Sequence, residues 1–568
     1  MDQSTKTNRY RKAASLAVSW LVGLFGLYTV LVTLLSQFNV RRGFRYSNSL
    51  QIDVHLLLGL GLVYLSVLLS RGKRSAWIIA CGISAFMLGE GTDLLLSGHF
   101  ATHVSLMLLM RSVLLPFIVL IILVLAREDF RVRSDTAAFR GSLKIAVLVL
   151  IITMAYGVSG FMLMDNSDFH QEIGFASALH HTVDQFDLTT NIPLHPYTKR
   201  AKLFMDSLSF VSVLAVIYVA LSLFQPVRLR FGDQTAARGR LLDLMRQYGA
   251  PSEDFFKLWP EDKHYFFSKT GSSGLAYRVQ RGTALVLADP VGDRSNFKAL
   301  LEQFADYCYA NDWSPSLVHV APDLTDIYKQ LGYDLQLIGQ EAIVDLTHFQ
   351  EETIKNKYFR NIANRFQKDN YQAEIIDPPH HQAVVERLKS ISDDWLSHPG
   401  RSERGFVMGY FNLEYLNRCR LLIARDAAQT IQGFINIIPA DFDAKEATFD
   451  MMRHASNSPS NLNDFMLMAL IERLKNEGYE RLNLGLSPLV GLDEPSEENR
   501  LIGRVLRFAY ANGDRFYSFS GLYRFKDKYE PHWNDRYLVY RGGVRGFSRT
   551  LNSLLIAMRL RKTLKQTV

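Results

Sequence analysis

An acidic and a basic side chain stand close together where an apolar segment ends. The segment runs from Ala447 to Asp450, and Arg453 follows three residues later. Open α/β sheets hold ligands at the ends of their strands, and a carboxylate near a guanidinium can move a proton or hold a charged ligand there. Asp450 and Arg453 are therefore predicted to lie in a ligand site. The alternative is a structural ion pair that caps the strand.

A second apolar segment ends in small residues. Arg481 to Leu484 is typical of a strand, and Gly485 and Ser487 follow it. A glycine lets the backbone approach a ligand that a side chain would block. Because adjacent strand ends can form one pocket, we predict that Gly485 and Ser487 bind substrate.

Aromatic and basic residues crowd together between positions 516 and 537. The cations of such a segment can hold a phosphate, and its rings can stack on an adenine. Arg524, Lys526 and Arg536 are therefore predicted to bind substrate. The alternative is a buried aromatic strand followed by a solvated charged turn, with Arg536 paired to Asp535 or Glu530.

Two other basic segments could attract phosphates. A predicted helix carries Lys355, Lys357, Arg360 and Arg365, and its basic side is either an RNA contact or an ordinary solvated face. The last 28 residues, 541–568, contain arginines, lysines and leucines but no acidic residue. We predict an amphipathic tail on the anionic inner leaflet of a membrane, with nucleic acid as the alternative partner.

Elements that could position these residues alternate along the chain after about residue 238, as in an α/β domain. Amphipathic helices are predicted at 297–311 and 464–477. The order of elements occurs twice, which predicts two related lobes, 235–346 and 347–540. The predicted strands are 275–279, 283–287, 317–320, 341–344, 421–424, 432–438, 447–450 and 481–484.

Composition narrows the possible classes of protein. The chain has 568 residues, 48% of them hydrophobic, and a net charge of +8, which favours phosphate-bearing partners such as anionic lipid or RNA. Its three cysteines form no CxxC pair, so neither a disulfide framework nor a cysteine-based zinc site is predicted. No other metal site is predicted. The sequence has no phosphate-binding P-loop, and no cofactor is predicted.

The first 230 residues are more apolar than the rest of the chain. Six segments are each long and apolar enough to predict a membrane-spanning helix. Basic residues are more frequent in the connecting segments that would be cytoplasmic if the N-terminus is cytoplasmic. Residues 1–230 are thus predicted to be a membrane domain, with the rest of the chain in the cytoplasm. The six segments are roughly 14–36, 52–70, 76–96, 103–126, 143–164 and 206–225.

From about residue 235 to 540, the chain resembles the phosphatidylglycerol lysyltransferase family of bacterial multiple peptide resistance factors. Seven segments carry the resemblance in collinear order. The resemblance implies a multi-pass α-helical membrane bundle followed by an α/β region of two acetyltransferase-like lobes. It also implies a bacterial inner-membrane enzyme that lacks the family's separate flippase region. The segments are Gly274–Val279, Ala288–Gly292, Gly339–Leu346, Glu403–Gly409, Phe449–Arg453, Asn483–Leu489 and Phe516–Tyr537.

The resemblance also implies an activity. Family members transfer an amino acid, most often lysine, from aminoacyl-tRNA to phosphatidylglycerol, which lowers negative surface charge and gives resistance to cationic peptides. Asp450 would then hold the ammonium group or transfer a proton, Arg453 would bind phosphate or oxyanion, and Asp514 would recognise the amino group. Arg524 and Lys526 would bind phosphate. The expected partners are aminoacyl-tRNA, phosphatidylglycerol, the bilayer and a second copy in a homo-oligomer.

Two departures from the family pattern fall near the presumed pocket. Asn461-Leu462-Asn463-Asp464 stands where Gly-Thr-Met-Asp is usual, and Asp514 stands where glutamate is usual. The amino acid used could therefore differ from lysine. The alternative functions are an acyl-CoA-dependent N-acyltransferase and a lipid transporter or scaffold without enzymatic activity.

Overall fold

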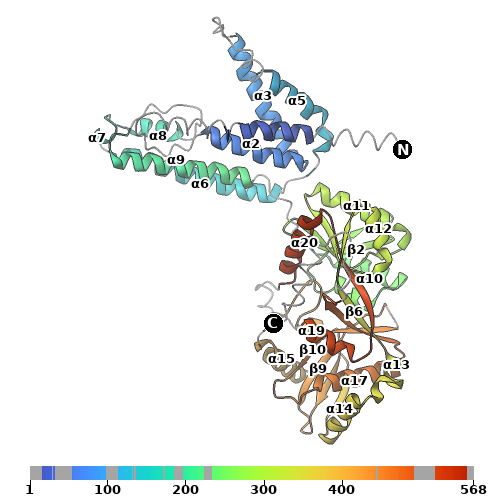
Figure 1. The fold of residues 1–568 in the computed structure, drawn as a ribbon. Coiled ribbons are helices and arrows are strands. Elements are labelled where there is room, and N and C mark those ends of the chain that lie inside the picture. The colour runs from blue at the N-terminus through green and yellow to red at the C-terminus, as the bar shows by residue number, and fades with distance from the viewer. Residues whose placement is uncertain are drawn as a thin grey trace. The chain divides into compact units, whose positions relative to one another are not determined.

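A computed structural model gives the fold of the chain, which divides into two compact units (Figure 1). Unit 1 consists of residues 1–228 with 309–312, and unit 2 of residues 229–308 with 313–568. The structure describes residues 16–28, 30–31, 54–96, 113–130, 132, 136–164, 166–170, 173–184, 196–222, 233–398, 400–442, 445–490 and 519–559.

Unit 1 is built from helices whose apolar residues pack in two clusters. Leu65, Ala76 and Leu123 belong to the first cluster, and Phe161 and Phe204 to the second. Residues 16–28 are also helical. The other helices are α2 (Val54–Ser70), α3 (Arg74–Leu96), α5 (Leu115–Leu125), α6 (Thr136–Met162), α7 (Asn166–Phe169), α8 (Phe175–Asp184) and α9 (Lys199–Ser222).

Helices thus occupy at least part of each predicted membrane-spanning segment. Among the residues that the structure describes, however, no helix is both long and apolar enough to cross a bilayer. The six membrane spans remain a prediction.

Unit 2 contains a mixed sheet with the strand order β1-β2-β3-β5-β12-β6-β11-β10-β9-β8-β7, and β4 pairs with β2. The first six strands are β1 (His264–Phe267), β2 (Ser273–Gln280), β3 (Thr283–Leu287), β4 (Val291–Gly292), β5 (Ser314–Val320) and β6 (Asp334–Asp345). The other six are β7 (Gln372–Ile376), β8 (Arg420–Arg425), β9 (Ile431–Ile437), β10 (Glu446–His454), β11 (Arg481–Pro488) and β12 (His532–Tyr540).

Helices bury both faces of this sheet, which explains its continuous apolar strands. In β8, Leu421 and Ile423 pack in one hydrophobic cluster, whereas Leu422 and Ala424 pack in another. Successive side chains of a strand point to opposite faces, so the two clusters lie on opposite faces. The first cluster includes residues of α10 (Thr235–Tyr248), α15 (Gln382–Ser397) and α20 (Gly543–Ala557). The second includes residues of α13 (Leu346–Glu351), α14 (Lys357–Lys368) and α17 (Leu462–Asn476).

The last strand of the chain crosses the predicted lobe boundary. β12 pairs with β5 and with β6, so it joins the half of the sheet formed by residues before 346. The segment 516–537 therefore contains helix α19 (Phe519–Asp527) followed by the start of a strand. The order is the reverse of the alternative given above, a strand followed by a turn.

The C-terminal segment 541–568 also differs from its prediction as a membrane-bound tail. It is helical over α20, as predicted, but Phe547 and Ala557 of that helix are buried in the first cluster. Thr550 bonds Ser316 of β5, and Ser553 bonds Thr283 of β3, each through the two hydroxyl groups. The apolar side of α20 therefore covers the sheet. Residues 560–568 lie outside the described part of the chain.

Candidate active site

Asp450 lies at an irregularity in β10. The pairing of β10 with β9 shifts register between Phe449 and Met452, which brings Asp450 beside the loop that carries Gly409. The Gly409 amide donates to Asp450 Oδ2 at 2.7 Å, and Asp450 Oδ1 is buried without a hydrogen-bond partner among the described residues. Burial raises the pKa of Asp450, while Asn436, Tyr415 and the Gly409 amide oppose that rise. An unsatisfied buried carboxylate oxygen is suited to receive a donor from a substrate.

Arg453 is held by groups other than Asp450. Its side chain is 6% exposed; Nη1 donates to Ser392 Oγ, and Nη2 lies 3.2 Å from Glu403 Oε1. The guanidinium carbon also lies 4.9 Å from the centre of the Trp395 ring. Arg453 thus forms its ion pair with Glu403, so the alternative of an Asp450–Arg453 ion pair is wrong.

Lys526, Gly485 and Ser487 meet at a second irregularity, in β11. The pairing of β11 with β6 shifts register between Asn483 and Leu486, and Gly485 adopts a φ of +79°. Lys526, from α19, donates to the carbonyl oxygens of Gly485 at 2.8 Å and Leu486 at 3.0 Å.

Lys526, Gly485 and Ser487 differ in protonation and in hydrogen bonding. Burial lowers the pKa of Lys526 to about 7, and Glu341 opposes that change. The Gly485 amide donates to Asn483 Oδ1 at 2.7 Å, so this amide, which we expected to serve a substrate, is already engaged. Ser487 is fully buried, and its hydroxyl has no partner among the described residues.

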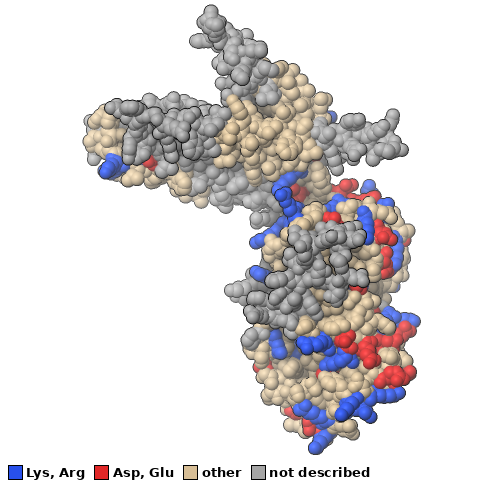
Figure 2. Space-filling view, viewed as in Figure 1, with Lys and Arg blue, Asp and Glu red and all other residues tan. Residues whose placement is uncertain are grey.

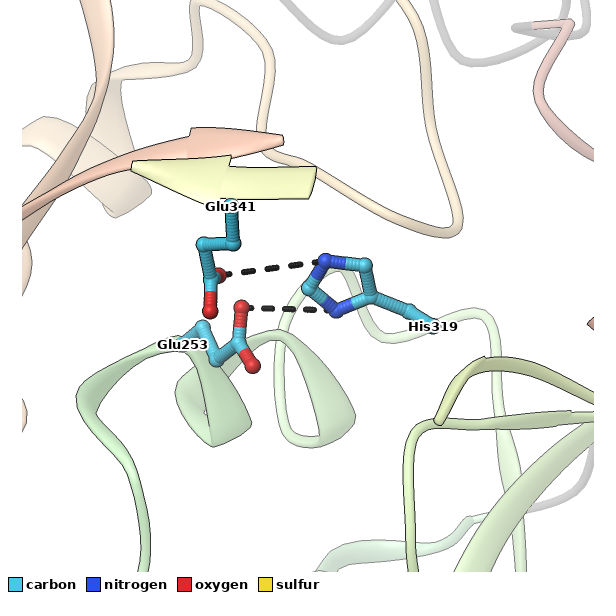
Figure 3. A group of neighbouring side chains, drawn as sticks. All are labelled: Glu253, His319 and Glu341. Carbon is cyan, nitrogen blue, oxygen red and sulfur yellow. Dashed lines mark ion pairs between the residues drawn. The ribbon is translucent and has the colours of Figure 1, made fainter. Parts of the chain in front are cut away.

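Arg536 pairs with two glutamates that the sequence did not single out as site residues. One nitrogen, Nη2, contacts Glu341 Oε2 and lies 3.3 Å from Glu253 Oε1. The remaining oxygens of the two carboxylates face His319, as Figure 3 shows. Nδ1 of His319 lies 3.3 Å from Glu253 Oε2, and Nε2 lies 3.8 Å from Glu341 Oε1. The predicted alternative partners of Arg536, the Asp535 and Glu530 carboxylates, do not pair with it.

Glu253, His319 and Glu341 are residue types that can hold a metal ion, and their ligand atoms lie within 4.8 Å of one another. Arg536, however, already places a positive charge on both carboxylates. Burial lowers the pKa of His319 to about 4 and raises that of Glu341 to about 8, so at neutral pH the imidazole and one carboxyl are uncharged. The positive charge of Arg536 and the proton on Glu341 therefore balance the charge of this cluster.

A cavity of about 390 Å³ opens beside this cluster and is lined by Glu253, His319 and Arg536. The segment Ala288–Gly292 forms part of its wall. Within that segment, Asp289 accepts hydrogen bonds at 2.8 Å from the Tyr328 hydroxyl and from the Ala321 amide. Burial raises the pKa of Asp289 to about 6. Both its carboxylate oxygens are engaged, so Asp289 shapes the wall of the cavity.

Other predicted site residues lie apart from these clusters. Arg524 is exposed on α19 and donates to the Ser520 carbonyl at 3.3 Å, and Asp514 lies outside the described residues. The predicted RNA-binding residues are exposed on α14 and the turn before it, where Lys and Arg gather at one end of unit 2 (Figure 2). They are Lys355, Lys357, Arg360 and Arg365.

Comparison with known proteins identifies the region that contains Asp450, Lys526 and Arg536. Residues 243–540 match the family model described as phosphatidylglycerol lysyltransferase, C-terminal. The chain belongs to this family. The resemblance predicted for residues 235–540 is thereby confirmed.

Relatives within this family match at moderate identity. The chain is 31% identical over 309 residues to a phosphatidylglycerol lysyltransferase of Bacillus subtilis, covering 54% of the chain and 35% of that protein. It is 31% identical over 302 residues to a phosphatidylglycerol lysyltransferase of Staphylococcus aureus strain N315, covering 53% of the chain and 35% of that protein. The chain thus spans about a third of the length of these relatives.

Two solved structures share the fold of unit 2. The C-terminal domain of a putative lysylphosphatidylglycerol synthetase from Agrobacterium fabrum is 27% identical, with a TM-score of 0.50, and the match covers 57% of this chain and 98% of that domain. L-PGS from Bacillus licheniformis is also 27% identical, with a TM-score of 0.50, and the match covers 58% of this chain and 98% of that one. The predicted α/β class of this region is confirmed.

Proposed function

We propose that the chain transfers an amino acid from aminoacyl-tRNA to a hydroxyl group of phosphatidylglycerol. The observation that carries the proposal is the family match over residues 243–540. This region contains the buried groups around Asp450, Lys526 and Arg536. The acetyltransferase-like character of the lobes and the use of lysine belong to this proposal. So does a position in the bacterial inner membrane, with unit 2 in the cytoplasm.

The reaction is the exchange of one ester for another and needs no external energy source. The lipid hydroxyl attacks the aminoacyl carbonyl carbon and forms a new C–O bond, and the bond to the tRNA ribose oxygen then breaks. The proton of the lipid hydroxyl ends on that ribose oxygen. The site must therefore supply a group that moves a proton and groups that stabilise the oxyanion.

Two buried groups are suited to move the proton or hold the amino group. Asp450 has a pKa raised by burial and one oxygen free to accept from a ligand. Lys526 has a pKa of about 7, so it can be neutral or charged at the working pH. We propose that Asp450 binds the ammonium group or transfers the proton, and that Arg453 faces the oxyanion or phosphate.

The remaining predicted residues receive supporting roles in the proposal. Arg536 holds Glu341 and Glu253 beside the cavity, Gly485 and Ser487 lie next to Lys526, and Arg524 offers an exposed charge to a phosphate. Asp514 is proposed to recognise the amino group. The exposed cations of α14 are proposed to contact the tRNA backbone, because phosphate contacts need accessible positive charge.

The proposed product explains a protective role. Esterifying phosphatidylglycerol with lysine adds two positive charges and changes the headgroup from about −1 to about +1, which weakens the attraction of cationic peptides. An alanyl ester would only neutralise the headgroup.

The test is a transfer assay with the full chain in detergent and phosphatidylglycerol. tRNA charged with radiolabelled lysine, alanine, ornithine or arginine is supplied in separate reactions, and the lipid is extracted. Label in the lipid phase that is lost in a folded Arg453→Ala variant supports the proposal and names the amino acid. Folded protein that labels lipid from none of the four tRNAs contradicts it and favours an acyl-CoA-dependent acyltransferase or a transporter.

A further inference from the structure

The loop of residues 403–411, here called the positioning loop, contacts both proposed catalytic residues. Its first residue, Glu403, pairs with Arg453 at 3.2 Å, and its Gly409 amide donates to Asp450 at 2.7 Å. Asp450 and Arg453 are three residues apart on β10. One loop therefore holds both of their side chains, from two points six residues apart.

Glu403 is itself fixed by the loop. Its Oε1 atom accepts the Phe411 amide at 2.8 Å as well as the Arg453 guanidinium, and its side chain is 12% exposed. A carboxylate with two donors on one oxygen has few alternative positions. Arg453 is held on its other sides by Ser392 and the Trp395 ring, so Glu403 completes its surroundings.

Gly409 is required by its closeness to Asp450. A Cβ atom at this position would lie 2.3 Å from Asp450 Oδ2 and 2.5 Å from a ring carbon of Tyr415. Real Cβ atoms do not approach other atoms so closely, so a side chain here would displace the carboxylate or the ring. Only glycine lets the backbone amide reach Asp450 at hydrogen-bond distance.

The end of helix α20 anchors the positioning loop. The Gly405 amide donates to the Met558 carbonyl at 2.9 Å, and Arg404 forms a β-bridge with Arg559. Phe406 is fully buried in the first hydrophobic cluster and has a φ of +68°. A backbone that is held at a positive φ is typical of segments that position functional groups.

We infer that the positioning loop sets the relative placement of Asp450 and Arg453, and that Glu403 and Gly409 are positioning residues for the proposed transfer. This inference rests on the proposed function. Glu403 acts through the Arg453 guanidinium, and Gly409 acts through its amide hydrogen bond to the Asp450 carboxylate.

The test compares two variants of the loop with two matched controls in the full chain. Glu403→Gln keeps the size of the side chain but removes its charge, and Glu414→Gln makes the same change at an exposed glutamate. Gly409→Ala adds the clashing Cβ, and Gly239→Ala adds a Cβ where no atom lies within 4 Å. All four are assayed for transfer of label to phosphatidylglycerol across pH, with the amino acid that the unmodified chain uses.

Glu403→Gln is expected to lower kcat roughly 10- to 100-fold with KM for both substrates nearly unchanged, because a displaced catalytic group slows the chemical step. Gly409→Ala is expected to move the acid limb of the pH–rate profile upward by about one pH unit, because a lost hydrogen bond raises the carboxyl pKa. The control variants are expected to match the unmodified chain.

The outcomes separate the two proposals. If the unmodified chain labels lipid and both loop variants match it, the positioning role is overturned and the transferase function stands. A Gly409→Ala variant that is slower at every pH, with no shift of the acid limb, shows a purely structural role and also overturns the inference. If the unmodified chain labels no lipid from any charged tRNA, the proposed function fails and this role for the loop fails with it.

Discussion

Buried charge is the main feature of unit 2 at the scale of single residues. Four ionisable side chains are buried, and burial displaces the pKa of each from its ordinary value. They are Glu341, Asp450, Arg453 and Lys526. Asp450 and Arg453 could be singled out from the sequence because they end an apolar segment. Glu341 lay within a predicted strand, where a single carboxylate gave no sign of the Arg536 and Glu253 partners that approach it from distant parts of the chain.

Asp450→Asn is expected to lower the transfer rate about 100-fold or more, because the amide cannot take a proton or pair with an ammonium group. The amide oxygen can still accept from the Gly409 amide, so the melting temperature should change little. Transfer kinetics and a thermal melt measure the two effects. Asp441→Asn, at an exposed residue that pairs with Arg246, is the control. A rate within threefold of the unmodified chain would remove Asp450 from the mechanism.

Lys526 makes stability depend on pH. Its pKa is about 7 in the folded chain and 10.5 ordinarily, so between these values the folded chain binds fewer protons than the unfolded chain. The free energy of unfolding therefore rises as pH increases from about 7 towards 10. Lys526→Met lacks this dependence, so the melting temperature of the unmodified chain should rise relative to that of the variant between pH 7 and about 9.5.

Thermal melts at several pH values measure this difference. Lys445→Met, at an exposed lysine, is the control and should differ from the unmodified chain by a constant amount. A constant difference for Lys526→Met as well would mean that Lys526 keeps an ordinary pKa in the folded chain.

At the scale of elements, periodicity predicted most strands and helices of unit 2. β3 has the predicted bounds, and α11 (Phe297–Ala310) and α17 lie within two residues of theirs. The irregularities in β10 and β11 were not predictable, because a register shift depends on the partner strand. These irregularities carry Asp450 and Gly485, so the sequence could identify residues of the site but not the register shifts that place them.

Helix α14 shows how one element can serve two purposes. Phe359, Ile362 and Phe366 are buried in the second hydrophobic cluster, while its cations remain exposed. Replacing both Lys357 and Arg360 with glutamate is expected to raise KM for charged tRNA about tenfold and to make log KM less dependent on log salt, because each lost phosphate contact lowers that slope. The melting temperature should be unchanged.

Initial rates at three salt concentrations test this expectation. Lys298→Glu, on an exposed face of α11, is the control. If KM and its dependence on salt stay the same in the α14 variant, the basic side of α14 is an ordinary solvated face.

At the scale of the whole molecule, the sheet of unit 2 joins segments far apart in the sequence. The predicted lobes 235–346 and 347–540 describe the order of elements along the chain, but β12 and α20 return to the strands of the first lobe. No local pattern could show this, because an apolar strand carries no mark of the neighbours it will pair with. Where unit 1 lies with respect to a bilayer likewise remains a prediction.

Deleting residues 543–568 is expected to destabilise unit 2 strongly, because it uncovers the face of the sheet on which Phe547 and Ala557 pack. The expected loss in melting temperature is more than about 10 °C, since several buried apolar side chains lose their cover. Deleting only residues 560–568 leaves α20 whole and is the matched control. Similar melting temperatures for the two truncated chains would show that α20 contributes little to stability.

The position of β12 has a consequence for synthesis on the ribosome. The chain emerges from its N-terminus, so β5 and β6 are complete about 210 and 190 residues, respectively, before the start of the strand that lies between them. Until then, each presents an unpaired edge, and such edges invite pairing with other chains. The nascent chain is therefore expected to be prone to aggregation until β12 is made, and fast elongation or a chaperone that covers strand edges would lower that risk.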